Sequence, residues 1–173
     1  MPPLAATSPL APFGCQLMEL TKNPPEGISV GLADDANMYV WDVMIIGPAN
    51  TIHEEAYYKA QLKFPKDFPN QPPEMVFGSE MWHPNIYPDG KVCISILHPP
   101  GTDKFNEFES AEERWRPILG IEAILISVLS MLVEPNTNSP ANIDAAVQFR
   151  DDFPAFKKKV KKCVRKSQEC AWD

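Results

Sequence analysis

The sequence predicts an α+β fold in which a four-stranded antiparallel meander is combined with a short N-terminal helix and C-terminal helices. Two observations support this prediction. Four short apolar stretches lie between residues 28 and 77, and only a few turn residues separate each from the next. Connections this short favour antiparallel pairing of neighbouring strands. After residue 117 the apolar residues recur every three or four positions instead, which is the spacing of a helix that packs one face on a core.

The N-terminal region is predicted to contain little regular structure. Residues 1–13 contain four prolines and little charge, so we expect a flexible Pro-rich arm there. A helical pattern begins only near Cys15, and Asn23 with the two prolines after it limits the helix to about two turns. Residues 14–173 are too few for two comfortable domains, and we expect a single one.

The four strand candidates are short and rich in β-branched and aromatic residues. In the third, every second residue from Tyr58 to Phe64 is apolar, so these side chains share one face of the sheet. Asp34-Asp35, Gly47-Pro48 and a Pro-rich segment mark the turns between candidates. The predicted strands cover residues 28–32, 39–46, 57–64 and 75–77.

The C-terminal part of the chain is predicted to be helical. Six apolar residues follow the spacing i, i+3, i+4, i+7, i+8 and i+11, which gives a helix with one wide buried stripe. Pro135 ends this helix because proline cannot continue its hydrogen bonding. Two further helices are predicted at 142–149 and 154–168. The residues of the stripe are Ile121, Ile124, Leu125, Val128, Leu129 and Leu132.

Composition and charge exclude several functional classes. The chain has 173 residues, of which 44% are hydrophobic, and a net charge of −7. This charge argues against a general nucleic-acid-binding protein, although seven Lys and Arg residues are concentrated between residues 157 and 166 without an acid among them. No apolar stretch reaches the roughly 18 to 20 residues of a membrane span. The four cysteines have neither disulfide-scaffold nor zinc-site spacing, which fits a reducing compartment.

Candidate chemistry is concentrated between His83 and Trp115. Cys93 follows a Pro-Asp-Gly turn and precedes three aliphatic residues within four positions, so a short segment presents the thiol. His83 and His98 are both available as partners for that thiol. Two interpretations stay open from these residues alone. Cys93 is either a reactive cysteine or a small buried apolar side chain, which is the commoner role of a lone cysteine.

A resemblance supports the reactive interpretation. The tripeptide His83-Pro84-Asn85, the cysteine eight positions after it and the later Trp115-Arg116-Pro117 together resemble the signature of ubiquitin-conjugating enzymes. The likeness extends from about residue 23 to the C-terminus and includes residues 64–69. The acidic segment at about residues 98–114, hereafter the acidic loop, is similar to that of a subfamily linked to degradation of endoplasmic-reticulum proteins.

The resemblance implies the ubiquitin-conjugating fold and a thioester mechanism. Cys93 would accept ubiquitin from a ubiquitin-activating enzyme and pass it to a lysine of a protein substrate, with help from a RING-type ubiquitin ligase. No metal and no bound cofactor are implied. The family's roles carried over to this sequence are oxyanion stabilisation for Asn85 and a structural brace for His83. A turn asparagine that bonds the local backbone is the alternative for Asn85, and both roles can operate together.

The acidic loop is expected to assist attack by the lysine. Many family members have an aspartate shortly before the helix that follows the active site, and here the matching position is Ser139, a much weaker base. We therefore expect Asp103, Glu107 and Glu109 to supply this charge or to position the acceptor ubiquitin. A solvated loop is the alternative. The acidic surroundings are also expected to oppose thiolate formation at Cys93, so a strongly activated thiolate is not predicted.

Two turns resemble the loops with which the family contacts ligases. The first is residues 65–73, with Asn70 at its centre, and the second is Arg116-Pro117-Ile118, with Ile118 at its centre. Two features depart from the family pattern. The N-terminal helix lacks the basic residues that dock on the activating enzyme, and residues 53–56 read His-Glu-Glu-Ala in place of Tyr-Glu-Gly-Gly.

These departures keep alternatives open. The chain could be a catalytically impaired binding module, a conjugating enzyme for another ubiquitin-like modifier, or a cysteine hydrolase, which the acidic surroundings disfavour. We expect a cytoplasmic protein, with recruitment to the cytosolic face of the endoplasmic reticulum or a nuclear location as further options. Neither a nucleic-acid partner nor a direct membrane span is expected.

Overall fold

The four predicted strands form one antiparallel sheet. The computed structural model describes residues 11–107 and 109–172. The strands lie in the order β1-β2-β3-β4, so each pairs with its neighbour in the sequence. Their ends lie within two residues of the predicted ones, and the predicted meander is confirmed. The strands are β1 (Ile28–Asp34), β2 (Asn37–Ile46), β3 (Tyr57–Lys63) and β4 (Glu74–Phe77).

The register of the sheet brings one side chain from each strand into a single row of the core. Trp41 of β2 is paired with Leu32 of β1 and with Leu62 of β3, and Leu62 is paired with Met75 of β4. Trp41, Leu62 and Met75 are fully buried, whereas Asp42, the next residue along β2, is exposed. This alternation is typical of an antiparallel sheet that covers a core with one face.

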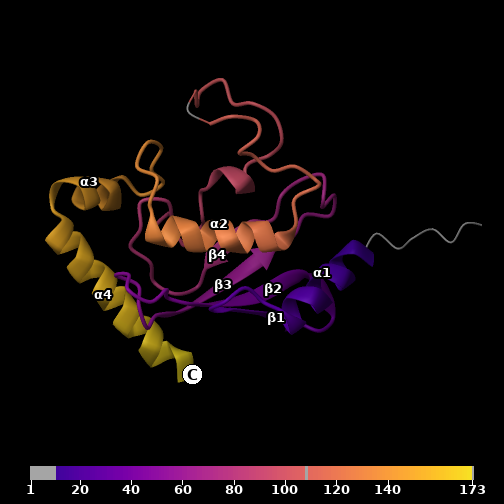
Figure 1. Ribbon diagram of the computed structural model, residues 1–173, viewed down its shortest axis with the longest axis horizontal. Helices are drawn as coiled ribbons and strands as arrows, with labels where there is room; N and C mark the ends of the chain where they lie inside the picture. Colours follow the sequence, from indigo (N-terminus) through magenta and orange to yellow (C-terminus); the bar gives the residue numbers. More distant parts are fainter. Residues whose placement is uncertain (1–10, 108, 173) are drawn as a thin grey trace, which may run out of the picture.

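Four α-helices and two 3-10 helices complete the described part of the fold. α2 crosses over the sheet, α1 lies at one end of the molecule, and α3 with α4 lies at the other (Figure 1). No helix within the described residues is both long and apolar enough to cross a lipid bilayer. The helices are α1 (Ala11–Lys22), η1 (Ser95–Leu97), α2 (Ile121–Val133), α3 (Ile143–Asp151), α4 (Phe153–Glu169) and η2 (Cys170–Trp172).

α2 confirms the predicted apolar stripe. Five of the six predicted residues are buried, and Leu129 is partly buried against the core. Each fully buried aliphatic side chain contributes about 1.5 to 3 kcal/mol to the free energy of folding, so the stripe anchors α2 on the sheet. The helix ends at Val133, two residues before Pro135. The two later helices also form at the predicted places, as α3 and α4.

The N-terminal helix is longer than the sequence predicts. α1 begins at Ala11, four residues before Cys15, and its 12 residues make about three turns. Pro12 lies in the first turn, where the amide hydrogen that proline lacks has no helical partner to lose. Residues 11–13 of the predicted arm therefore belong to the helix, and residues 1–10 lie outside the described residues.

The turn at residues 53–56 closes without the two glycines of the family pattern. Glu55 has a φ of 67°, in the left-handed region that favours glycine and costs other residues about 1 to 2 kcal/mol. Two backbone hydrogen bonds offset this cost. The amide of Ala56 donates to the carbonyl of His53 at 3.0 Å, and the amide of Gly47 donates to the carbonyl of Ala56 at 2.9 Å. Ala56 itself is fully buried.

Candidate active site

A tight turn that starts at Tyr87 positions Cys93. The amide of Gly90 donates to the carbonyl of Tyr87 at 2.8 Å. Gly90 has a φ of 98°, and a Cβ at this position would lie 2.2 Å from the carbonyl oxygen of Phe77, so only glycine fits. The chain then returns past the preceding segment, where the amide of Cys93 donates to the carbonyl of Asn85 at 2.9 Å. The backbone that leads to the thiol is therefore fixed.

His83 braces this segment against α2. Its ring is fully buried. Nε2 lies 2.9 Å from the carbonyl oxygen of Met131, and Nδ1 accepts the amide of Asn85 at 3.0 Å. These two contacts require a neutral ring with its hydrogen on Nε2. Burial lowers the pKa of His83 to about 3, so the ring stays neutral at physiological pH. This geometry fits a structural brace and leaves no ring nitrogen for acid or base chemistry.

The side chain of Asn85 holds the segment that follows α2. Its Nδ2 donates to the carbonyl of Asn136 at 2.7 Å, and its Oδ1 accepts the amide of Asn136 at 2.8 Å. This is the backbone-bonding role that the sequence left as an alternative. An amide nitrogen carries two hydrogens, so one N–H remains besides the one directed at Asn136. Asn85 also lines the cleft beside Cys93, so the geometry allows both roles.

A histidine and a carboxylate lie in series with Cys93. The Sγ of Cys93 is 3.6 Å from Nε2 of His98, and Nδ1 of His98 is 2.7 Å from Oε2 of Glu109. An ionised carboxylate only accepts hydrogen bonds, so Nδ1 carries a hydrogen and Nε2 faces the sulfur. This order of nucleophile, imidazole and carboxylate is the one by which acyl-transfer sites activate serine and cysteine.

Glu109 is fixed by three neighbours. Besides its contact with His98, its Oε2 accepts the hydroxyl of Ser95 at 2.7 Å, and its Oε1 accepts from the guanidinium of Arg114 at 2.7 Å. The Glu109 side chain is 5% exposed. Burial alone would raise the pKa of this carboxyl, but the hydrogen bonds from Ser95 and His98 and the charge of Arg114 lower it overall. Glu109 is therefore ionised at neutral pH and holds the His98 ring in place.

The contact with His98 reverses the expectation for the thiol. The acidic surroundings predict a thiol that resists ionisation, yet the pKa of Cys93 is lowered, because the hydrogen bond from His98 outweighs burial of the sulfur and the charge of Glu109. The same hydrogen bond raises the pKa of His98. The predicted effect of the acids is present, since the charge of Glu109 raises the pKa of Cys93, but the prediction left out the imidazole that lies between the buried acid and the thiol.

Cys93 lies where two clefts meet. One cleft of about 530 Å³ is lined by η1, the acidic loop and the C-terminal part of α2, and includes His98, Glu109 and Ser139. The other, of about 470 Å³, includes Tyr87 and residues of the segment 65–74. The half-buried thiol therefore lines both clefts. No group of three or more His, Cys, Asp or Glu side chains within residues 11–107 and 109–172 is arranged to hold a metal ion.

The acidic loop separates its predicted acids into two environments. Glu109 is buried against His98, whereas Asp103 and Glu107 are exposed. The segment between η1 and α2 extends beyond α2 on the side away from the sheet (Figure 1). The structure therefore brings one of the three predicted acids to the thiol and leaves the other two facing solvent.

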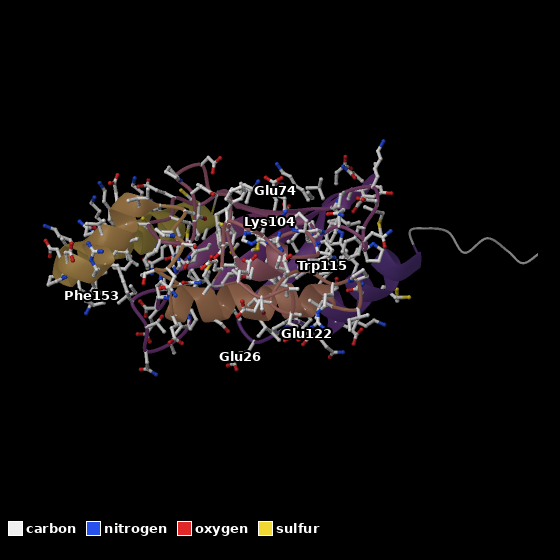
Figure 2. All side chains as sticks on the ribbon, turned by 90° about the horizontal axis from the view of Figure 1, so that it is seen from above. Glu26, Glu74, Lys104, Trp115, Glu122 and Phe153 are labelled. Carbon is white, nitrogen blue, oxygen red and sulfur yellow. The ribbon has the colours of Figure 1, made fainter. Side chains whose placement is uncertain are left out.

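The two predicted ligase loops lie side by side. The indole Nε1 of Trp115 donates to the carbonyl of Pro69 at 2.8 Å, and its ring packs on Phe68 with centroids 5.8 Å apart. Figure 2 shows Trp115 toward the α1 end of the molecule and Phe153 at the opposite end. The candidate partner residues beside this contact are all exposed, and Ile118 is 84% exposed. They are Asn70, Arg116, Pro117 and Ile118.

His98 is a functional candidate that the sequence offers as a partner for the thiol without distinguishing it from His83. Spacing alone cannot show which of His83 and His98 contacts the thiol, because this depends on the path of the chain after Cys93. The single turn of η1 returns the chain so that His98, five residues after Cys93, lies against the sulfur. A three-residue 3-10 turn has no periodic signature. The available signal is a histidine five residues after the cysteine that is followed by two prolines.

Comparisons with known sequences agree with this geometry. Residues 14–164 match the family described as ubiquitin-conjugating enzyme. The chain is 56% identical over 154 residues to ubiquitin-conjugating enzyme E2 15 of Schizosaccharomyces pombe, a match that covers 89% of this chain and 92% of that protein. It is 52% identical over 149 residues to ubiquitin-conjugating enzyme E2 G2 of Homo sapiens, covering 86% of this chain and 90% of that protein.

Comparison with solved structures gives the same result. The structure of human ubiquitin-conjugating enzyme E2 G1 matches with a TM-score of 0.62 and 52% sequence identity, and the match covers 71% of this chain and 93% of that chain. The predicted α+β fold is therefore shared with a solved structure whose sequence is 52% identical to this chain. The chain belongs to the ubiquitin-conjugating enzymes, transferases that carry ubiquitin as a thioester and work with ubiquitin-activating enzymes and ubiquitin ligases.

Proposed function

We propose that Cys93 is the residue that carries ubiquitin, and that the protein passes this ubiquitin from an activating enzyme to a lysine of a protein substrate. The observation that supports this most strongly is the half-buried thiol at the meeting point of two clefts, 3.6 Å from His98. The cleft that includes Tyr87 would hold the C-terminal tail of the bound ubiquitin, and the acceptor would enter through the cleft that includes Glu109 and Ser139.

Loading of the enzyme exchanges one thioester for another. The thiolate of Cys93 attacks the carbonyl carbon of the ubiquitin C-terminus, the bond from that carbon to the sulfur of the activating enzyme breaks, and that sulfur leaves as a thiolate. A thioester forms and a thioester is consumed, so the exchange is nearly balanced in free energy. The main requirement is a ready thiolate at neutral pH, which His98 supplies by lowering the pKa of Cys93.

Transfer to lysine requires a base and a hydrogen-bond donor. The amine attacks the thioester carbon, its proton passes to Nε2 of His98, the carbon–sulfur bond breaks, and Cys93 leaves as a thiolate. Glu109 keeps Nε2 directed at the sulfur during this step. The second N–H of Asn85 is the proposed donor to the oxyanion, and a donor in this position contributes about 10² to 10³ in rate.

Asp103 and Glu107 are proposed to position the acceptor ubiquitin. Both carboxylates are exposed on the acidic loop, and at physiological ionic strength such charges act over about 8 Å. Replacing both by lysine is expected to slow ubiquitin-chain formation at least fivefold, while discharge of the thioester to free lysine stays within twofold. An equal loss in both assays would place these acids in the chemistry instead.

The surface formed by Asn70 and residues 116–118 is proposed to bind a RING-type ligase. Its exposed Ile118 is the kind of apolar side chain that anchors an interface. The acidic loop, which resembles that of a subfamily linked to degradation of endoplasmic-reticulum proteins, supports a role in proteasomal degradation of such proteins. The protein would then act in the cytosol, at the cytosolic face of that membrane.

The test is formation of the thioester. The protein is incubated with activating enzyme, ATP and ubiquitin, and the products are separated on a non-reducing gel. We expect an adduct that disappears with reductant in the wild type, an adduct that resists reductant in Cys93→Ser, where an oxygen ester replaces the thioester, and no adduct in Cys93→Ala. An unchanged adduct in Cys93→Ala would refute the assignment of Cys93. Charging with a different ubiquitin-like modifier in place of ubiquitin would redirect the proposal to that modifier.

A further inference from the structure

We infer that the site of Cys93 also transfers ubiquitin to hydroxyl groups, so that serine and threonine side chains of proteins are acceptors in addition to lysine. This inference rests on the proposed function, because it requires the ubiquitin thioester on Cys93. The inference is based on the imidazole of His98. Its Nδ1 is held by the buried carboxylate of Glu109, and its Nε2 faces the sulfur of Cys93.

Loading with ubiquitin changes the role of His98. In the free enzyme, Nε2 of His98 shares a hydrogen with the sulfur of Cys93. In the thioester the sulfur carries neither a hydrogen nor a charge, whereas the bond from Nδ1 to Glu109 does not involve the sulfur. Nε2 then presents its lone pair beside the thioester. It can accept a proton from whichever nucleophile attacks there.

An alcohol depends on such a base more than an amine does. A lysine ammonium has a pKa near 10.4, and once it has lost its proton the neutral amine is a good nucleophile. A serine hydroxyl is far less acidic, so it must give up its proton during the attack, to a base that is already in position. An imidazole backed by a carboxylate is the arrangement by which acyl-transfer enzymes activate hydroxyl groups.

The cleft beside the thiol has room for a small acceptor. Its volume of about 530 Å³ exceeds that of a serine or threonine side chain, and Asn138 and Ser139 are neutral polar residues on its wall. The hydroxyl of Ser95 already donates to Glu109 at 2.7 Å, which shows that this network accommodates an alcohol. A hydroxyl that enters the cleft therefore meets neutral polar groups and a base, beside the carboxylates of Glu113 and Glu134.

The step is balanced in atoms and electrons. The hydroxyl oxygen forms a bond to the carbonyl carbon of the thioester, and the hydroxyl proton passes to Nε2 of His98. The carbon–sulfur bond breaks, and Cys93 leaves with the electron pair as a thiolate. The imidazolium and the thiolate then form the same pair as in the unloaded enzyme. An oxygen ester is more stable than a thioester, so the transfer runs downhill.

The test uses the full chain charged with ubiquitin, after which EDTA removes Mg²⁺ and stops activation. The thioester is then offered Nα-acetyl-lysine, Nα-acetyl-serine or Nα-acetyl-threonine, in which the acetyl group blocks the α-amine. Intact mass identifies each product, and neutral hydroxylamine cleaves esters but not amides. We expect ubiquitin esters of serine and threonine with the wild type. His98→Gln should form them at least about 10²-fold more slowly, and Glu112→Gln, at an exposed position of the same loop, at the wild-type rate.

Glu109→Gln tests the positioning role of the carboxylate. Removing its charge lowers the pKa of His98, so the pH at which ester formation reaches half of its maximum should move downward. A purely structural effect would lower the rate at every pH without moving this midpoint. The other ionisable groups around the His98 ring are unchanged in this variant. They are Cys93, which is acylated, Arg114, which contacts Glu109, Glu113 and Glu134 on the wall of one cleft, and Asp67, Glu74, Tyr87 and Lys91 on the wall of the other.

Two results would overturn the inference while leaving the proposed function intact. The first is a wild-type enzyme that forms the thioester and modifies Nα-acetyl-lysine but yields no hydroxylamine-sensitive product. The second is ester formation at an unchanged rate in His98→Gln. Failure of the wild type to form the thioester, which is checked first on a non-reducing gel, would overturn the proposed function and this inference together.

Discussion

Cys93 and His98 form a pair in which each residue favours the charged form of the other. The sulfur and Nε2 lie 3.6 Å apart, and their contact lowers the pKa of the thiol while it raises that of the imidazole. Glu109 behind the ring adds to the effect on His98. The contact with His98 therefore increases the thiolate fraction of Cys93 at neutral pH.

His98→Gln is expected to move the alkylation profile of Cys93 to higher pH. The wild-type rate with iodoacetamide should reach half of its maximum at a lower pH than that of the variant, because the imidazolium stabilises the thiolate. In the variant the burial of the sulfur remains and raises the pKa, so the midpoint moves upward. Mass spectrometry of the peptide that contains Cys93 measures the rate. The exposed Cys170 serves as an internal control whose profile should be the same in both proteins. Equal midpoints for Cys93 would contradict the pair.

The residues of the candidate site differ in how far the sequence could predict them. His83, Asn85 and Cys93 belong to one local turn, so their order and spacing are enough to identify them. The contact between His98 and Glu109 could not be predicted, because Glu109 lies 11 positions after His98 in an irregular loop and no periodicity shows which acid folds back. Asp103 and Glu107 are closer to His98 in sequence, yet both are exposed.

Among the elements, those defined by periodicity or turn chemistry were predictable to within two residues, and α1 was not. The strands alternate between core and solvent, and α2 carries a continuous apolar stripe, so local pattern and packing agree. The extent of α1 depends on a contact distant in sequence. Its Gln16 accepts the amide of Ile121, the first residue of α2, at 3.0 Å. No pattern within residues 11–22 shows this contact.

Gln16→Ala is expected to destabilise the protein by about 1 kcal/mol. The N-terminal residue of α2 would lose the only side-chain acceptor that the described residues provide for its amide, since Gly120 at the N-cap has no side chain, and lost caps cost about 0.5 to 2 kcal/mol. Urea unfolding followed by tryptophan fluorescence measures the change. Glu19→Ala, at an exposed position of the same helix, should stay within about 0.5 kcal/mol of the wild type. Equal stabilities of Gln16→Ala and wild type would show that water replaces the glutamine without cost.

At the scale of the whole molecule, two neutral histidines lie in the interior between the sheet and the candidate site. The rings of His53 and His83 have centroids 6.3 Å apart, and both are almost completely buried. Nδ1 of His53 is 2.7 Å from the hydroxyl of Tyr58, and its Nε2 has no hydrogen-bond partner among the described residues. Burial lowers the pKa of His53 to about 4 and that of His83 to about 3.

These histidines are expected to make the fold sensitive to acid. Below about pH 6.5 the unfolded chain binds a proton at each histidine, whereas the folded protein does not until about pH 4 for His53. The unfolding free energy therefore falls with decreasing pH in this window, by about 1.4 kcal/mol per pH unit for each residue. His98, whose pKa is raised in the folded protein, acts in the opposite direction.

The double variant His53→Phe with Tyr58→Phe should remove one of these two contributions. Replacing both residues avoids a buried Tyr58 hydroxyl without a partner, which alone would cost about 1 to 3 kcal/mol. Urea unfolding between about pH 6 and 4.5 should then show a slope against pH that is smaller by up to about 1.4 kcal/mol per unit, because one proton fewer is taken up on unfolding. His83 keeps its own contribution in both proteins. An unchanged slope would mean that His53 is protonated in the folded protein as readily as in the unfolded chain, and that the acid sensitivity arises elsewhere.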